Sequence, residues 1–180
     1  MRRFGRVILA LFAVALAAVA TVPRPAPEFV VQMPSAQVLL SQFRGKVILL
    51  SFIHTTCPHC QQAVGVINQL EKDYGARGFQ ALGAAFNDNA QQLLPDFLAR
   101  FRPVYPVGYT SRASVIEYLQ VSSNTPMYVP IILFIDKKGT IREQHIGNDD
   151  KFLEDLNKNA RAVIESLLKE TAPAKKATKK

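Results

Sequence analysis

The chain contains two cysteines, Cys57 and Cys60, and they follow a continuous apolar run, Val47–Ile53. A run of β-branched and aromatic residues of this length is typical of a strand that is buried on both faces. Beyond Cys60, apolar residues recur every three or four positions to about Tyr74, which predicts an amphipathic helix. This junction constrains the fold strongly, because it fixes where a buried strand ends and where a helix begins.

The rest of the chain alternates between strand patterns and helix patterns. Strands are predicted at residues 29–33, 38–43, 79–86, 104–109, 131–135 and 140–146. Helices are predicted around residues 93–101, at 112–120 after an N-cap at Ser111, and as one long helix after Asp149 and Asp150. Pro95 either kinks the first of these helices or begins a new one. The alternation predicts one α/β domain, with a central mixed β-sheet, helices on both faces and an N-terminal strand extension.

The N-terminus has the layout of a secretory signal peptide. Arg2, Arg3 and Arg6 precede an apolar run over residues 7–20, which ends in Ala-Val-Ala. The run is shorter than the roughly 20 residues that span a bilayer. We expect residues 1–20 to be a cleaved signal peptide or, alternatively, an uncleaved anchor that reaches residue 22. Both the cleaved signal peptide and the uncleaved anchor would export the body of the protein to the periplasm or another extracytoplasmic compartment, where disulfides persist.

The remaining boundaries follow from composition. Residues 21–28 are predicted to be a Pro-rich linker, residues 29–170 the folded domain, and residues 171–180 a Lys-rich disordered tail. Three arginines near the N-terminus and four lysines in the tail account for seven units of the net charge of +8. The body is therefore nearly neutral, and we expect no nucleic-acid partner. The tail could associate weakly with an anionic membrane surface.

The spacing of the two cysteines favours redox chemistry. A structural disulfide that closes so short a loop restricts the unfolded chain little, and a zinc site requires four ligands. At the start of a helix, free N–H groups and the helix dipole favour a thiolate at Cys57. Pro58 suits the first helical position, and His59 either adds a positive charge near the sulfur or is a surface residue. Cys60, one turn inside, is expected to be buried and to resolve a mixed disulfide.

Four stretches together resemble the thioredoxin superfamily, closest to the periplasmic TlpA/ResA type. They are Pro27-Glu28-Phe29, the segment 40–47, the Cys57–Cys60 motif, and Val129-Pro130 followed by the run 131–135 with Asp136 and Gly139. The resemblance implies a thioredoxin-like fold over about residues 27–169 and a thiol–disulfide oxidoreductase without a metal or another cofactor.

The resemblance also implies roles for individual residues. Cys57, Pro58, His59, Cys60 and Pro130 would be catalytic. A cis bond between Val129 and Pro130 would place the Val129 backbone where it binds a client's extended chain. The implied partners are client proteins with cysteines and a membrane electron donor.

Several positions depart from the pattern and bear on the direction of electron flow. Ser51 replaces the buried Asp of thioredoxin, and Thr56 replaces the usual Trp before the first cysteine. The Pro58-His59 dipeptide and Val129 match the oxidant DsbA, whereas TlpA/ResA-type proteins more often reduce. We expect a reductant, with a DsbA-like disulfide donor as the alternative.

Other functions remain open at this point. His145 with the two cysteines would supply the ligand types of a Sco-like copper chaperone. A peroxidase of the peroxiredoxin type needs a Thr three residues before the attacking cysteine, where this chain has His54. The domain could also be a binding module whose disulfide is idle.

Overall fold

The computed structural model describes residues 21–170. The predicted signal peptide and the predicted Lys-rich tail lie outside these residues. The strands are β1 (Arg24–Pro25), β2 (Val30–Gln32), β3 (Gln37–Leu39), β4 (Val47–Ile53), β5 (Phe79–Ala85), β6 (Val107–Tyr109), β7 (Ile131–Ile135) and β8 (Thr140–His145). The helices are α1 (Pro58–Tyr74), α2 (Ala90–Phe101), α3 (Arg112–Leu119), α4 (Asp150–Leu153) and α5 (Leu156–Lys169), with 3-10 turns η1 (Leu40–Phe43) and η2 (Gly75–Arg77).

The described strands form one mixed sheet in the order β1-β8-β7-β4-β5-β6-β2-β3. β4 lies at its centre, parallel to β5 and antiparallel to β7. All seven residues of β4 are buried, as the apolar run predicts. The mixed α/β sheet expected from the sequence is thus confirmed, and it has the thioredoxin-like arrangement.

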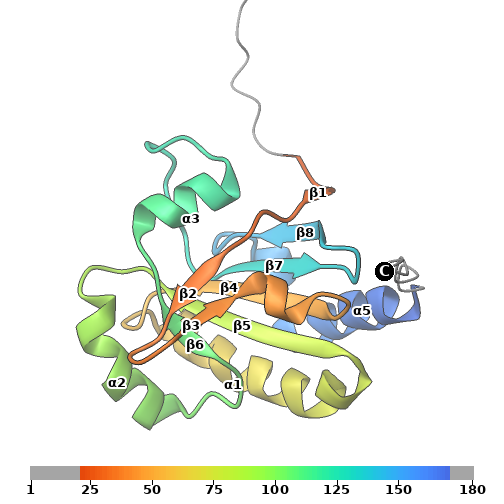
Figure 1. Cartoon of the computed structure of the whole chain (residues 1–180), viewed down its shortest axis with the longest axis horizontal. Coiled ribbons are helices and arrows are strands. Elements are labelled where there is room, and N and C mark those ends of the chain that lie inside the picture. Colours follow the sequence, from red (N-terminus) through yellow and green to blue (C-terminus); the bar gives the residue numbers. More distant parts are fainter. Residues whose placement is uncertain (1–20, 171–180) are drawn as a thin grey trace, which may run out of the picture.

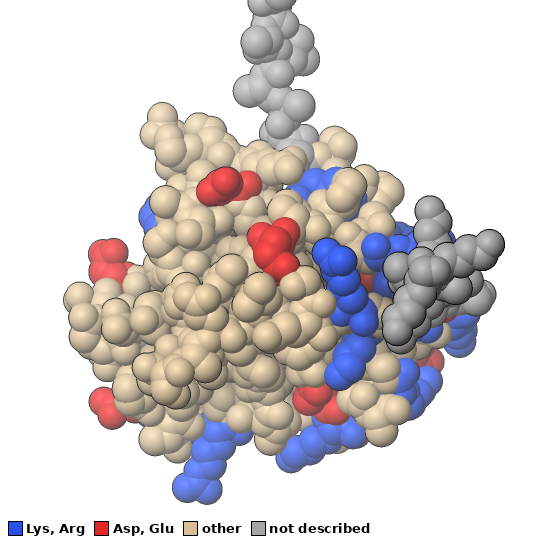
Figure 2. Space-filling model, viewed as in Figure 1, with Lys and Arg blue, Asp and Glu red and all other residues tan. Residues whose placement is uncertain are grey.

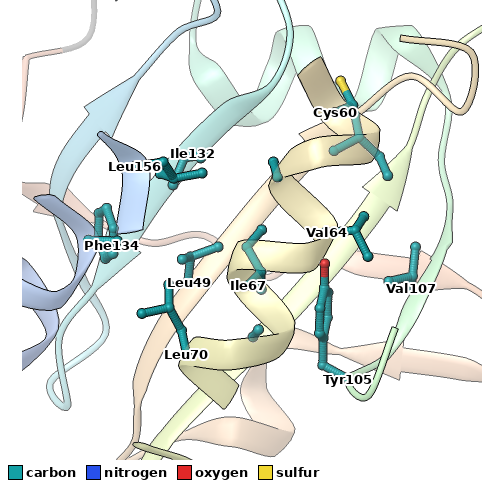
Figure 3. Packing of buried hydrophobic residues seen from close by; sticks show 14 of the residues in the cluster. Leu49, Cys60, Val64, Ile67, Leu70, Tyr105, Val107, Ile132, Phe134 and Leu156 are labelled. Carbon is teal, nitrogen blue, oxygen red and sulfur yellow. The ribbon is translucent and has the colours of Figure 1, made fainter. Parts of the chain in front are cut away.

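Helices cover both faces of this sheet (Figure 1). On one face, α1, α2 and α5 pack against alternate residues of the central strands, including Leu49 and Phe134. On the other face, α3 and the N-terminal segment pack against the intervening residues, including Leu50 and Phe52. Figure 3 shows Cys60 on the same side of α1 as Val64. The first turn of α1 is therefore anchored in the first of these two cores.

The segment predicted to be a linker belongs in part to the fold. Arg24 and Pro25 pair with β8 at Ile141 and Thr140, and the Arg24 side chain is buried. Its Nη2 donates a hydrogen bond to the backbone oxygen of Tyr118, 3.1 Å away. A proline-rich sequence can form such a strand because it lies at the edge of the sheet, where a missing N–H costs no ladder bond.

Two further elements differ from the sequence prediction. The strand expected over residues 38–43 ends at Leu39 and continues as the 3-10 turn η1, because the backbone N–H of Ser41 binds Glu28 Oε1 at 3.0 Å. The single long helix expected after Asp149 is divided into α4 and α5. Asp155 begins α5 by accepting a hydrogen bond from the N–H of Lys158 at 3.1 Å.

Charged side chains are unevenly distributed over the described surface. Figure 2 shows lysine and arginine side chains gathered toward the side where α5 ends, with a large uncharged area beside them. Within residues 21–170, none of the helices combines the length and the apolar character that crossing a membrane requires.

Candidate active site

The cysteine pair lies at the C-terminal end of β4, where the chain turns into α1. Cys57 is the N-cap of α1, and its Sγ accepts a hydrogen bond from the backbone N–H of Cys60 at 3.3 Å. Pro58 occupies the first helical turn, where its missing N–H costs nothing. Both cysteines are present as free thiols. The predicted placement of the pair at a strand-to-helix junction is confirmed.

The two thiols lie in different surroundings. Cys57 is partly exposed, whereas Cys60 is fully buried. Burial raises the pKa of the Cys60 thiol, and the neighbouring Cys57 raises it further. The site therefore has one thiol that a disulfide from solution can reach and a second one, directly behind it, that stays protonated at neutral pH.

The turn before Cys57 is held by two amides that sequence analysis did not identify. Asn87 Oδ1 accepts hydrogen bonds from the backbone N–H of Thr55 at 2.9 Å and from its hydroxyl at 3.3 Å. Gln61 Nε2 donates to the backbone oxygen of Thr55 at 2.9 Å. Thr55 is buried, so these bonds replace water for its backbone groups. Asn87 directly follows β5, and its side-chain amide is part of the site.

A second loop completes the site from the other side. The Val129–Pro130 peptide bond is cis, as the resemblance implies, and Cys57 Sγ lies 3.8 Å from the backbone oxygen of Val129. The N–H of Gly147 donates to the backbone oxygen of Tyr128 at 2.9 Å. A Cβ at Gly147 would lie 2.5 Å from the Val129 nitrogen. Only glycine allows the loop after β8 to approach the cis-proline loop this closely.

A groove with a volume of about 700 Å³ opens beside the pair. One wall comes from α1, with His59, Gln62, Ala63 and Val66, and the other from Pro130, Gly147 and the junction of α4 with α5. The groove thus begins between His59 and Pro130, which are neighbours in sequence of Cys60 and Val129, and runs along α1.

The three histidines occupy distinct environments. His59 is exposed and lines the groove, and none of the described hydrogen bonds joins it to Cys57 Sγ. His54 packs edge-on against Phe86, and burial lowers its pKa. His145 lies near carboxylates at both ring nitrogens, with Nδ1 2.7 Å from Asp149 and Nε2 3.0 Å from Glu143.

These placements bear on the alternative functions. Residues 21–170 contain no group of three or more His, Cys, Asp or Glu side chains that could hold a metal ion, and the described partners of His145 are the carboxylates of Asp149 and Glu143. Ser51, in the place of the thioredoxin aspartate, is buried, and its hydroxyl lies 3.4 Å from the backbone oxygen of Leu82. What the arrangement can do chemically is thiol–disulfide exchange at Cys57, followed by attack from Cys60.

Comparisons with known proteins agree with this geometry. A family model described as Redoxin matches residues 21–164. The thiol-disulfide oxidoreductase ResA of Bacillus cereus is 26% identical over 129 residues, which cover 71% of this chain and 71% of ResA. ResA of Geobacillus kaustophilus is 27% identical over 140 residues, covering 77% of this chain and 75% of that protein.

A solved structure gives the same result for the fold. The crystal structure of a protein from Chlorobium tepidum assigned as the thiol:disulfide interchange protein DsbE has a TM-score of 0.66 and 25% identity. The match covers 79% of this chain and 96% of that one. The chain therefore belongs to the Redoxin family, as a thioredoxin-fold thiol–disulfide oxidoreductase distantly related to ResA and DsbE.

Proposed function

We propose that this protein reduces disulfides of client proteins outside the cytoplasm, with Cys57 as the attacking thiol and Cys60 as the resolving thiol. The observation that carries the proposal is the asymmetry of the pair: an accessible sulfur at a helix N-terminus, and a buried one within the same helical turn. Pro58 fixes the turn between them. Val129 and Pro130 would bind the extended backbone of the client, next to the sulfur that attacks.

The reaction balances as two exchanges. The Cys57 thiolate attacks one sulfur of the client disulfide, and the other client sulfur leaves as a thiolate and takes up a proton. Cys60 then loses its proton and attacks Cys57, which releases the first client sulfur. Two electrons pass to the client and a Cys57–Cys60 disulfide remains. We propose that a membrane electron donor with its own dithiol reduces this disulfide again.

One observation supports the direction of reduction. Strong oxidants of this chemistry stabilise their reduced form, and here Cys57 Sγ accepts one described N–H bond, from Cys60, and none from His59. The opposite direction, a DsbA-like disulfide donor, is favoured only by the Pro58-His59 dipeptide and by Val129.

The reduction potential of the Cys57–Cys60 pair tests the proposal. We expect a value near about −270 mV in equilibrium with a glutathione or dithiothreitol couple, and a value near about −120 mV would mean a disulfide donor. Because His59 is exposed and does not contact Cys57 Sγ, His59→Ala should shift the potential by less than about 30 mV. Reduction of insulin by wild type but not by Cys57→Ser would support catalysis, whereas no reduction by either would leave only a binding module, and equal reduction by both would overturn the role of Cys57.

The extracytoplasmic location rests on residues 1–20 and has its own test. A fusion of residues 1–28 to a reporter that is active only after export should give activity in a bacterial host. The same fusion with Arg2, Arg3 and Arg6 changed to Glu should lose it, because a signal peptide needs its positive n-region. Activity of both fusions, or of neither, would contradict the export signal.

A further inference from the structure

The groove beside the active site has a one-sided charge. Three carboxylates line it where α4 meets α5, on Asp150, Glu154 and Asp155, and its lining contains no lysine or arginine. His59 faces them from α1. Carboxylates are ionised at neutral pH, so the groove has a negative rim on the side that lies across from His59.

Two of these carboxylates are free to meet a ligand. In the described part of the chain, Asp150 and Glu154 take part in no salt bridge, and both residues are exposed. The preceding Asp149 is different, because it lies 2.7 Å from His145 Nδ1. Lys151 lines a separate hollow beside His145, so it does not offset the charge within the groove.

The groove also has an apolar surface. Ala63 and Val66 of α1 lie opposite Leu153 and Leu156, and Pro130 closes the end near Cys57. A client segment that runs beside Val129 would present alternate side chains to this surface. An apolar side chain fits its interior, and a positive side chain fits its rim.

We propose that this groove selects client segments that carry a lysine or arginine within about three residues of the reactive cysteine, together with an apolar side chain. The inference rests on the proposed function and names the substrate class of the same site. Opposite charges concentrate a substrate at a cleft and raise its association rate. Because Asp150 and Glu154 are exposed, salt should screen this preference.

Three peptides test the proposal, each closed by an internal disulfide and identical except for Lys, Glu or norleucine two residues from the cysteine. The second-order rate constant for reduction by the fully reduced chain is measured by acid quench and chromatography. We expect the Lys peptide to react about 10-fold faster than the Glu peptide at low salt. In Asp150→Asn/Glu154→Gln this ratio should fall to about 2 or less, and 0.5 M salt should lower the wild-type ratio in the same way.

The matched control is Asp96→Asn/Glu117→Gln, which removes the same charge from exposed positions on α2 and α3. It should keep the wild-type ratio. Equal rates for the Lys and Glu peptides with wild type would overturn the proposal, as would an equal loss of preference in the control. A rate constant that falls as protein concentration rises would also overturn it, because a second copy would then fill the groove.

The neutral compound 2-hydroxyethyl disulfide separates this proposal from the function on which it rests. If the reduced chain reduces this compound and the norleucine peptide but does not distinguish Lys from Glu, the substrate class is wrong and the proposed function stands. If it reduces neither of them, the proposed function itself is overturned, and this inference with it.

Discussion

At the scale of single residues, the protein gives two identical thiols different properties by burying one of them. Cys60 is fully buried on the inner side of α1, and burial raises its pKa. Cys57 remains accessible, three residues away. In the proposed reaction, the order of the two exchange steps follows from access: a client disulfide would meet Cys57 first, and Cys60 would react only with the sulfur beside it.

This difference predicts the rate of alkylation. We compare two variants that each keep one cysteine, Cys57→Ser and Cys60→Ser. At pH 8, iodoacetamide should modify Cys60 in the first at least about 10-fold more slowly than Cys57 in the second. The reason is that the thiolate fraction falls about tenfold for each unit by which a pKa is raised. The rate for Cys60 should rise as the pH is raised further, since a raised pKa moves ionisation to higher pH. Mass spectrometry measures both rates. In 8 M urea the two variants should react alike, and equal rates in the folded proteins would contradict the burial argument.

Sequence analysis identified those residues of the site that lie close together in the sequence. Cys57, Pro58 and Cys60 form one helical turn, so their spacing is enough to place them. Asn87 and Gln61 were missed, because the bonds that they make to Thr55 depend on how α1 and the loop after β5 pack together. The only sign of this role in the sequence was the position of Asn87, directly after the predicted strand 79–86.

At the scale of elements, the site depends on two loops that touch. The loop before β7 carries Val129 and Pro130, and the loop after β8 holds it through the bond from the Gly147 N–H to Tyr128. The contact between the loops is backbone against backbone, so a side chain at Gly147 cannot rotate out of the way.

We therefore expect Gly147→Ala to displace the loop that carries Val129. Its Cβ would lie 2.5 to 2.6 Å from backbone atoms of Tyr128 and Val129, and misplacing a substrate-binding group can cost up to about 100-fold in rate. Insulin reduction should fall at least tenfold while the far-ultraviolet circular dichroism stays unchanged. Gly65→Ala is the control, because a Cβ there meets nothing within 4 Å. Full activity of Gly147→Ala would contradict the role of this contact.

The elements show where sequence patterns were sufficient and where they were not. The strands at 47–53 and 131–135 follow from their continuous apolar runs, and the helix after Cys57 follows from its periodicity. The division into α4 and α5 was missed, because Asp149 and Asp150 were taken to cap one helix, whereas Asp155 caps a second one. That division matters for function, because it places Glu154 and Asp155 at the groove.

At the scale of the whole molecule, the N-terminal hairpin of β2 and β3 pairs with the neighbouring strand β6 at one pair of residues, Gln32 and Tyr109, while Val31 packs into the core on that face of the sheet. Gly108 allows this approach, since a Cβ there would lie 2.2 Å from the backbone oxygen of Gln32. The sequence predicted the two strands but not their partner, because a single bridge leaves no repeating pattern to detect.

Gly108→Ala should therefore loosen this end of the sheet. We expect the free energy of unfolding to fall by about 2–3 kcal/mol, as in overpacked cores, measured by urea denaturation. The rate of disulfide exchange at Cys57 should change little under native conditions, because the hairpin lies at the far end of the sheet from β7. A variant as stable as Gly65→Ala would show that the hairpin can shift at no cost.

Both edge strands of the described sheet are short. β1 has two residues, one of them Pro25, and β3 has three. A long edge strand with unpaired backbone groups can pair with strands of other chains and so start aggregation. Because both edges are short, the proposed pairing of a client with the Val129 backbone beside Cys57 meets little competition from the sheet edges. The short edges thus give aggregation-prone chains few places to add a strand to this protein.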